Sequence, residues 1–338
     1  MKFLIIGLGS MGKRRIRNLR YLGIDDIIGF DTDDEKCRQV TDMHEIKTFD
    51  KIDKAMAEKP DALIISTPPH LHHEYAMMAA EMGIHFFTEL NILSDNLNKV
   101  VEVAKKNNII AAASCDMRYI ASIKRIKEFI EKGVVGDIVA FTYHSGQYLP
   151  DWHPWENYRK SFFSRKETSG TREIIAEELN WLPWVFGKIT SVFCMKGKFS
   201  HLEADIDDVY QILMKFEDKF IGSLLVDVVS RIPYRQLKII GGEGVITWDG
   251  NEKTVKVFSL DKKWKEYKEE IGTVENGYIH KEEPYIEEME YFIAAIKGEV
   301  ECFYTLEENI RMMKIMEAIE VSADAGTYMR LKGVDWIA

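Results

Sequence analysis

The sequence of 338 residues predicts an α/β protein of two domains: a doubly wound parallel sheet at the N-terminal end, then an α+β domain with a largely antiparallel open sheet. Short apolar runs alternate with helical patterns in the first third of the chain, as in parallel sheets. Later apolar runs follow one another through glycine-containing turns, as in antiparallel sheets. The pattern changes after Arg118, so we expect domains at residues 1–118 and 119–338.

In the first domain, strands and helices alternate from the start of the chain. Apolar runs predict strands at residues 3–6, 27–30, 62–66, 85–88 and 109–113. Helical periodicity between these runs predicts helices that include residues 11–22, 71–82 and 96–107. Because each helix returns the chain to the same end of the sheet, this order predicts parallel strands with helices on both faces.

In the second domain, an amphipathic helix over residues 123–132 ends at Gly133, and strands then predominate. The expected strands are residues 139–145, 189–196, 208–216, 221–229, 236–241 and 244–249. Helices at residues 171–186, 285–296 and 306–325 would cover one face of their sheet. An uncovered apolar sheet face is costly in water, so we expect a homodimer or homotetramer that buries it.

The composition narrows the class of partner. The formal net charge is −10 at pH 7, and no Lys/Arg-rich stretch is long enough to follow a phosphate backbone, so we expect no nucleic acid partner. The four cysteines are far apart and lack C-x-x-C spacing, which favours a reducing cytoplasm and no zinc site. The sequence has no signal-peptide pattern and no apolar run of ~18 residues, so we expect no membrane association.

Glycines with G-x-G-x-x-G spacing follow the first expected strand and open the first helix. This context predicts the dinucleotide-binding turn of a Rossmann domain. The first glycine permits a tight turn, the second lets the backbone approach a pyrophosphate, and the third lets the helix pack on the strand. We expect Lys13 and Arg14 to add positive charge beside the turn. The expected cofactor contacts come from Gly7, Gly9, Ser10, Met11 and Gly12.

An acidic residue ends the second expected strand, about 20 residues after the glycines, where a carboxylate accepts hydrogen bonds from the ribose hydroxyls of a dinucleotide. Asp31 occupies this position. Its charge would repel a 2′-phosphate, so the expected cofactor is NAD rather than NADP. Asp33 and Asp34 compete for the role, and a helix N-cap or turn aspartate is the alternative interpretation of Asp31.

Several further motifs lie along the chain. Thr67-Pro68-Pro69-His70-Leu71-His72 follows the strand at residues 62–66, and Glu89 ends a later strand. With Arg118-Tyr119 and the glycine-containing segments at 133–137, 146–152 and 241–244, the chain resembles the Gfo/Idh/MocA family of NAD(P)-dependent oxidoreductases over nearly its whole length. The resemblance implies that further residues hold or adjoin the cofactor: Thr67, Pro68, His72, Glu89 and Arg118.

The resemblance also implies a chemistry, in which a secondary alcohol of a sugar, polyol or nucleotide sugar exchanges a hydride with nicotinamide. A lysine in a Glu-Lys-Pro triplet and a histidine in the second domain usually handle the proton in that family. Here Leu90 replaces the lysine and Asn91 the proline, and leucine cannot carry a proton. Alignment back from residues 184–187 places three residues where the family has Asp, His and Asp: Glu173, Glu177 and Asn180.

The helix at residues 171–186 is informative without the resemblance. Glu173, Glu177 and Asn180 lie at i, i+4 and i+7, on one face of a mostly apolar helix. Buried carboxylates need compensation, which Arg172, Arg118 or Arg159, a bound substrate or a raised pKa would supply. The alternative is a solvated acidic edge widened by Glu178.

We predict a proton relay rebuilt around Glu177, with Glu173 and Tyr148 as the other catalytic candidates. The aromatic segment at residues 148–158, which contains Glu156, suits sugar recognition by stacking and hydrogen bonds. A loop packed on a neighbouring subunit is the alternative. The expected substrate contacts are Asp151, His153, Arg159 and Asn180. Although His70, His72 and His73 are close in sequence, neighbouring side chains on a turn point in different directions, so we expect no metal.

Three functions follow from these observations. The first is an NAD-dependent oxidoreductase that acts on a sugar-like substrate. The second is an NAD-binding protein with a regulatory or binding role, since the nucleotide motif is intact and the usual proton carriers are absent. The third is redox-neutral sugar chemistry, in which a tightly held NAD oxidises the substrate transiently.

Overall fold

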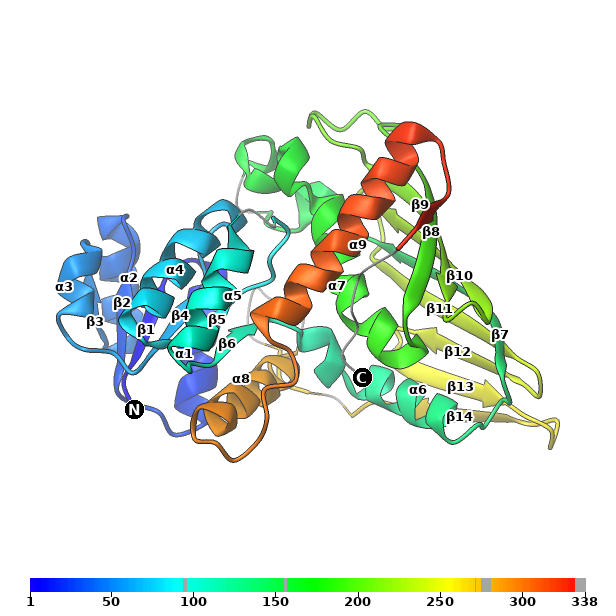
Figure 1. Cartoon of the computed structure of the whole chain (residues 1–338), viewed down its shortest axis with the longest axis horizontal. Coiled ribbons are helices and arrows are strands. Elements are labelled where there is room, and N and C mark those ends of the chain that lie inside the picture. Colours follow the sequence, from blue (N-terminus) through cyan, green and yellow to red (C-terminus); the bar gives the residue numbers. More distant parts are fainter. Residues whose placement is uncertain (94–95, 155–156, 271, 275–280, 332–338) are drawn as a thin grey trace. The chain divides into compact units, whose positions relative to one another are not determined.

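The computed structural model describes residues 1–93, 96–154, 157–270, 272–274 and 281–331 (Figure 1). The chain divides into two compact units. The first unit comprises Met1–Tyr119 and Gly272–Ile310, and the second comprises Ile120–Ile271 and Arg311–Ala338. Each unit is built around one β-sheet.

The sheet of the first unit has six parallel strands in the order β3-β2-β1-β4-β5-β6. Its strands are β1 (Phe3–Ile6), β2 (Ile27–Phe30), β3 (Lys47–Phe49), β4 (Ala62–Ile65), β5 (His85–Thr88) and β6 (Ala111–Ala113). Strands β1, β2 and β4 are buried along their whole length, as in a sheet covered on both faces. The strand order reverses between β1 and β4, which is the position where doubly wound sheets bind ligands.

Helices connect these strands. They are α1 (Ser10–Tyr21), α2 (Asp34–His44), α3 (Ile52–Met56), α4 (His72–Met82) and α5 (Leu97–Lys106), with short 3-10 turns at Pro69–Leu71 (η1) and Asp116–Tyr119 (η2). The predicted α/β class and the strands at 3–6, 27–30 and 85–88 are confirmed. Strand β3 and helices α2 and α3 were not predicted. Strand β3 has only three residues, and its first, Lys47, is exposed.

Helix α8 (Glu283–Ile296) belongs to the first unit, although the sequence analysis placed a helix at 285–296 over the sheet of the second domain. Met289, Phe292 and Ile293 of α8 are buried in the same core as Phe87 of β5. The rings of Phe87 and Phe292 are 5.6 Å apart. The expected boundary at residue 118 therefore describes the end of one segment, and the chain returns to the first unit later. Amphipathic periodicity shows that a helix buries a face but does not identify what covers it.

The sheet of the second unit has nine strands in the order β14-β13-β12-β11-β7-β10-β9-β8-β15. They are β7 (Ile138–Gly146), β8 (Ile189–Gly197), β9 (Val209–Phe216), β10 (Phe220–Asp227), β11 (Tyr234–Gly241), β12 (Val245–Asp249), β13 (Thr254–Phe258), β14 (Trp264–Lys268) and β15 (Met329–Arg330). Among the strands within the described ranges, β7 and β10 pair in parallel and the other neighbours are antiparallel. The predicted open, largely antiparallel sheet is confirmed, and β13 to β15 were not predicted.

Helices α6 (Ala121–Glu131), α7 (Gly170–Phe186) and α9 (Leu306–Ala325) complete the described elements, with 3-10 turns at Leu149–Asp151 (η3), Tyr158–Lys160 (η4), Phe162–Ser164 (η5) and Lys166–Thr168 (η6). Helix α7 packs on one face of the sheet, where the Phe141 and Phe186 rings stack with centroids 4.4 Å apart. On the opposite face Leu213, Ile221 and Ile240 are exposed. The alternation of buried and exposed residues along β9 and β10 follows from this one-sided cover.

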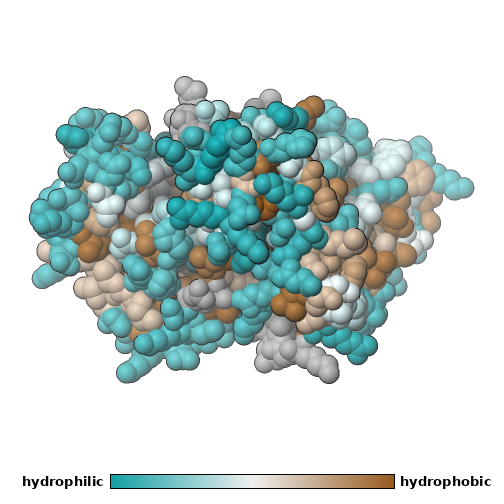
Figure 2. All heavy atoms as spheres, turned by 90° about the horizontal axis from the view of Figure 1, so that it is seen from above, coloured by the Kyte–Doolittle hydropathy of each residue, from teal (hydrophilic) through white to brown (hydrophobic). Residues whose placement is uncertain are grey.

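One face of the molecule is mostly polar. Figure 2 shows hydrophilic residues over much of the face that it draws, with hydrophobic residues in smaller patches between them. Within the described residues, every helix is too short or too polar to cross a membrane.

Candidate functional site

The glycine turn follows β1 and leads directly into α1. Gly7 has a φ of +92°, and a Cβ there would lie 2.6 Å from the Ser66 carbonyl oxygen. A Cβ on Gly12 would lie 1.9 Å from the Gly7 carbonyl oxygen. Both glycines are therefore required by the fold itself, because any side chain would collide with backbone.

Gly9 differs from its two neighbours in the motif. Its φ is −73°, which any residue adopts, and no heavy atom lies within 4 Å of the position of a Cβ. Among the described residues no side chain caps α1, and its first turn contains no acidic residue. The fold leaves open space and uncapped N–H groups at this turn, which fit the pyrophosphate of a dinucleotide.

Asp31 is buried at the end of β2 and holds the glycine turn in place. Its carboxylate accepts hydrogen bonds from the Leu8 backbone N–H (2.8 Å) and the Asp33 backbone N–H (3.0 Å). The helix N-cap is Asp33, which accepts from Glu35 N–H, so the capping role considered for Asp31 belongs to its neighbour. Asp31 therefore stabilises the glycine turn and lies at the position where a carboxylate can accept hydrogen bonds from ribose hydroxyls.

The turn after β4 is braced by a buried histidine. His72 bonds through Nε2 to the Thr67 carbonyl oxygen (2.8 Å) and through Nδ1 to the Asn91 side-chain amide (2.9 Å). Asn91 also contacts Thr88 Oγ1 (2.7 Å), and burial lowers the pKa of His72. Both ring nitrogens are thus used within the protein, and His72 acts by fixing Thr67 and Pro68. The Thr67 hydroxyl oxygen is buried and has no hydrogen-bond partner among the described residues.

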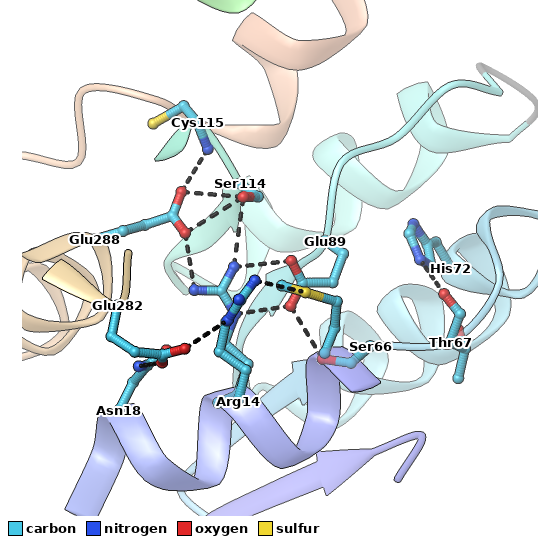
Figure 3. A network of polar contacts seen from close by, with 12 residues as sticks. Arg14, Asn18, Ser66, Thr67, His72, Glu89, Ser114, Cys115, Glu282 and Glu288 are labelled. Carbon is cyan, nitrogen blue, oxygen red and sulfur yellow. Dashed lines mark hydrogen bonds and ion pairs between the residues drawn. The ribbon is translucent and has the colours of Figure 1, made fainter. Parts of the chain in front are cut away.

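Glu89 is paired with the buried Arg15, and Figure 3 shows Glu89 with Ser66, Ser114 and Glu288 in the surrounding network of polar contacts. Arg15 pairs with Glu89 through Nε (2.7 Å) and Nη2 (2.8 Å), and with Glu288 of α8 through Nη1 (2.9 Å). The Ser66 hydroxyl donates to Glu89 (3.1 Å), and the Ser114 hydroxyl donates to Glu288 (3.1 Å). We define Arg15, Glu89 and Glu288 as the Arg15 cluster; it joins α1, the end of β5 and α8.

Burial dominates the electrostatics of the Arg15 cluster. Burial alone would lower the pKa of Arg15, but the two carboxylates raise it above its ordinary value. Burial raises the pKa of Glu288 to about 7, against the attraction of Arg15. The side chain of Arg15 is fully buried, whereas that of Glu89 is 13% exposed. Because two carboxylates share one guanidinium, the Arg15 cluster has a net charge of −1 when both carboxylates are ionised.

Lys13 and Arg14 of α1 have partners within the first unit. Arg14 Nε pairs with Glu282 at 3.1 Å, and Figure 3 shows Asn18 bonded to the same carboxylate (2.9 Å). Lys13 bonds to Gln39. Arg17 lies 3.2 Å from the same Glu282 carboxylate, so two guanidiniums share one acid. The charge of Lys13 and Arg14 beside the pyrophosphate stays a prediction.

Arg118 is buried in η2, at the end of the first segment of this unit. Its guanidinium lies over the Tyr304 ring, 4.6 Å from the centroid, and 5.6 Å from that of Phe303. Arg118 thus packs on aromatic rings of its own unit.

The predicted acidic helix is α7, which begins after Ser169, whose side chain accepts from Arg172 N–H (3.3 Å). Glu173 and Glu177 are half-buried on it, and Asn180 is buried. Arg172 pairs with Glu320.

The partner of Glu177 is Arg235 of β11. Arg235 Nη2 lies 2.7 Å from Glu177 Oε2, with side-chain exposures of 21% and 30%. Arg235 Nε also lies 3.8 Å from Glu178. Arg235 was not predicted as a site residue, because it reaches α7 through the pairing of β11 with β7, which sets Arg235 opposite Ser145. Because both side chains are partly exposed, this ion pair can contact a ligand without burying an uncompensated charge.

Glu178 is fully buried and is not part of a solvated acidic edge, which corrects that alternative. Its carboxylate accepts from Trp181 Nε1 at 2.5 Å. Burial raises the pKa of Glu178 and also raises that of Tyr143 well above its ordinary value. Arg235 therefore lies near the buried carboxylate of Glu178 as well as the partly exposed carboxylate of Glu177.

The segment after β7 carries the remaining expected substrate contacts. Its aromatic side chains pack on one another: the Trp152 and Phe163 rings are 5.0 Å apart, and His153 lies 5.7 Å from Phe163. The cavity between them holds about 10 Å³, room for one water at most. Asp151 is exposed. Glu156 lies outside the described residues.

Arg159 and Tyr148 have partners of their own. Arg159 forms an exposed ion pair with Glu203, and so does not compensate the carboxylates of α7. Tyr148 lies under the guanidinium of Arg231, 3.7 Å from its ring centroid. The structure thus brings Tyr148 to a cation that the sequence analysis did not single out.

Family models match most of the chain. The model described as "Oxidoreductase family, NAD-binding Rossmann fold" of Gfo/Idh/MocA proteins matches residues 1–114. The model described as "GFO/IDH/MocA C-terminal domain" matches residues 123–247. The first unit therefore carries the NAD-binding Rossmann domain of these proteins, in agreement with the geometry of the glycine turn.

Individual relatives are distant. Levoglucosan dehydrogenase of Pseudarthrobacter phenanthrenivorans is 24% identical over 227 residues, 58% of this chain and 57% of that protein. The 2,7-anhydro-N-acetylneuraminate hydratase of Mediterraneibacter gnavus is 24% identical over 198 residues, 57% of this chain and 52% of that protein. The matches thus span between half and two thirds of these relatives. A solved structure of levoglucosan dehydrogenase in complex with NADH and L-sorbose has a TM-score of 0.86 at 17% identity and covers 99% of both chains, so the fold is shared.

Proposed function

Because the chain belongs to the Gfo/Idh/MocA family of oxidoreductases, we propose that it is an NAD-dependent oxidoreductase of a secondary alcohol on a sugar, polyol or nucleotide sugar. One observation carries the proposal. Gly9 is the glycine of the turn that the fold does not require, and its missing side chain leaves space at the uncapped end of α1. A dinucleotide pyrophosphate is the group that uses such space.

NAD, when bound, supplies the hydride acceptor. Gly7 to Gly12 hold the pyrophosphate through backbone N–H groups, with Ser10 and Met11 as the first residues of α1. Asp31 receives the ribose hydroxyls and disfavours the extra phosphate of NADP. Thr67, fixed by His72, offers a buried hydroxyl that lacks a partner within the described residues.

Glu177 takes the proton of the substrate alcohol. Hydride departs from the carbon only as the hydroxyl proton leaves, so a basic group must lie within hydrogen-bond reach of that hydroxyl. Leu90 cannot serve, whereas Glu177 has a carboxylate that is 30% exposed and is positioned by Arg235 at 2.7 Å. Glu173 and Asn180, on the same helix, orient the substrate.

A sugar-like substrate is supported by the name of a relative, levoglucosan dehydrogenase. The other relative, a hydratase, favours a second candidate, in which the sugar is oxidised transiently and NAD is restored in the same cycle. That reaction releases product without net NADH.

The test follows nicotinamide absorbance while the purified protein and NAD are incubated with neutral sugars, polyols, uronates and nucleotide sugars, with the products analysed by mass spectrometry. Oxidation predicts equal amounts of NADH and oxidised sugar. Product without NADH would favour the redox-neutral candidate. Silence by both readouts, despite tight NADH binding, would overturn both and leave a binding role.

We also propose a homodimer or homotetramer in the cytoplasm, assembled through the open face of the second unit's sheet. Leu213, Ile221 and Ile240 are exposed on that face, which is costly in water. Light scattering after size exclusion is expected to give a mass of two or four chains, and a monomer at all concentrations would contradict this.

A further inference from the structure

Beyond the carboxyl ends of β7 and β10, two loops run side by side in the second unit. The two strands are parallel neighbours, as Figure 1 shows. Their pairing continues past the strands, because Gln147 N–H donates to the Asp227 carbonyl oxygen at 3.2 Å. Leu149 N–H donates to the Val228 carbonyl oxygen at 3.0 Å. The two loops are thereby fixed against each other.

One loop carries Tyr148 and the other carries Arg231. The guanidinium of Arg231 lies 3.7 Å from the centroid of the Tyr148 ring. Stacking on an aromatic face fixes the plane of the guanidinium but uses none of its N–H donors. Arg231 is exposed, and no carboxylate in the described ranges pairs with it. The N–H groups of Arg231 are therefore held in a fixed orientation and can donate hydrogen bonds to a bound ligand.

The carboxylate nearest in sequence is committed to shaping the loop. Asp227 accepts from the Val229 N–H (2.9 Å), the Ser230 N–H (2.7 Å) and the Ser230 hydroxyl (2.9 Å). His144 Nε2 lies 2.7 Å from the same carboxylate. Burial opposes the charge of Asp227, but these hydrogen bonds outweigh it and lower its pKa. Asp227 thus builds the turn that presents Arg231 and does not neutralise it.

Arg231 differs in this respect from three other arginines of the second unit. Each of those is paired with a carboxylate: Arg159 with Glu203, Arg172 with Glu320, and Arg235 with Glu177. The chain as a whole carries a net charge of −10, so a free anion is repelled unless a local cation attracts it. A planar guanidinium with open N–H donors matches a carboxylate or a phosphate through two parallel hydrogen bonds.

We propose that Arg231, held on Tyr148, selects a sugar that bears a carboxylate or phosphate group over the corresponding neutral sugar. The inference rests on the proposed function, since it assigns the substrate class of that enzyme. Arg235 joins the same end of the sheet, because β11 begins beside the end of β7. Glu177, which pairs with Arg235, therefore belongs to the same structural neighbourhood as the anion-binding residue.

The experiment measures binding by calorimetry to the NADH-loaded protein with three probes: D-glucuronate for the carboxylate, UDP-glucose for the phosphate, and D-glucose as the neutral sugar. We expect at least one acidic probe to bind ~10-fold or more tightly than D-glucose, which is about the strength of one charge-assisted hydrogen bond. Arg231→Met is expected to remove that preference without changing NADH affinity or the unfolding temperature. The acidic probe that loses its preferential binding in Arg231→Met identifies the recognised group as a carboxylate or a phosphate.

The matched control is Arg125→Met. Arg125 is also exposed and also lies over a tyrosine, Tyr267, at 5.2 Å, but on α6. It is expected to leave the acidic preference intact. Equal binding of neutral and acidic probes, or a preference that survives Arg231→Met, would overturn the inference. NADH binding, measured in the same titrations, tests the cofactor site. Nicotinamide absorbance tests hydride transfer. A failure of the proposed function is therefore distinguished from a failure of this inference.

Discussion

The Arg15 cluster of the first unit and the Glu177–Arg235 pair of the second unit use the same chemistry in different surroundings. The shortest contacts between guanidinium and carboxylate are 2.7 Å in both. Arg15 is sealed from solvent, whereas Glu177 is 30% exposed. A buried ion pair holds secondary-structure elements together, whereas a partly exposed ion pair remains accessible to a ligand. The difference separates the charges that build the protein from those that we assign to its chemistry.

The largest expected effect concerns Glu177. Glu177→Gln keeps the shape of the side chain but removes its capacity to accept a proton, so turnover is expected to fall about 100-fold or more. NADH affinity and the unfolding temperature are expected to stay the same. Steady-state rates with the substrate found in the screen would measure the loss.

Glu203→Gln is the matched control for that variant, since it alters another carboxylate paired with an arginine of the second unit. We expect it to turn over as the wild type does. If Glu177→Gln retained full turnover, Glu177 would have no place in the mechanism.

The sealed cluster is expected to affect stability. Arg15→Met retains most of the buried stem but leaves Glu89 and Glu288 without their cation, which is expected to lower the free energy of unfolding by about 3–5 kcal/mol. Urea denaturation measures this, with Arg159→Met of the exposed pair as a control that should change little. A variant as stable as the wild type would show that the cluster contributes no stability.

A smaller effect concerns pH. Burial raises the pKa of Glu288 from 4.5 to about 7 in the folded protein, so the folded state holds its proton more tightly than the unfolded state. The stability of the wild type relative to Glu288→Gln should therefore fall as pH rises from about 4.5 to about 7, and stay constant above that range. Thermal unfolding across these pH values measures the difference, and a difference independent of pH would contradict the assignment.

Some of this arrangement was predictable from sequence because it is local. The glycine turn is set by residues close together in the chain, and the spacing of Glu173, Glu177 and Asn180 on α7 follows from helical periodicity. Arg15 lies three residues after Gly12, a spacing that places it on the buried face of α1 and would have marked it as a residue to explain.

Other features depend on partners distant in sequence. Arg235 reaches Glu177 through the register of β11 on β7, and Glu288 reaches Arg15 because α8 returns to the first unit. Neither pairing leaves a periodic pattern. The first unit's second segment was missed for the same reason, since apolar periodicity in α8 is equally consistent with a place on either sheet.

Binding of the dinucleotide at the Gly9 turn underlies the proposed function. Gly9→Ser adds a side chain where the fold leaves space, and serine is a favoured helix N-cap, so folding should be unaffected. Gly242→Ser is the control, because the nearest atom to its Cβ position is the Asp137 carbonyl oxygen at 3.8 Å. Calorimetric titration with NADH is expected to show saturable binding by the wild type and Gly242→Ser, and its loss in Gly9→Ser. Equal NADH binding by Gly9→Ser, or none by the wild type, would contradict the claim.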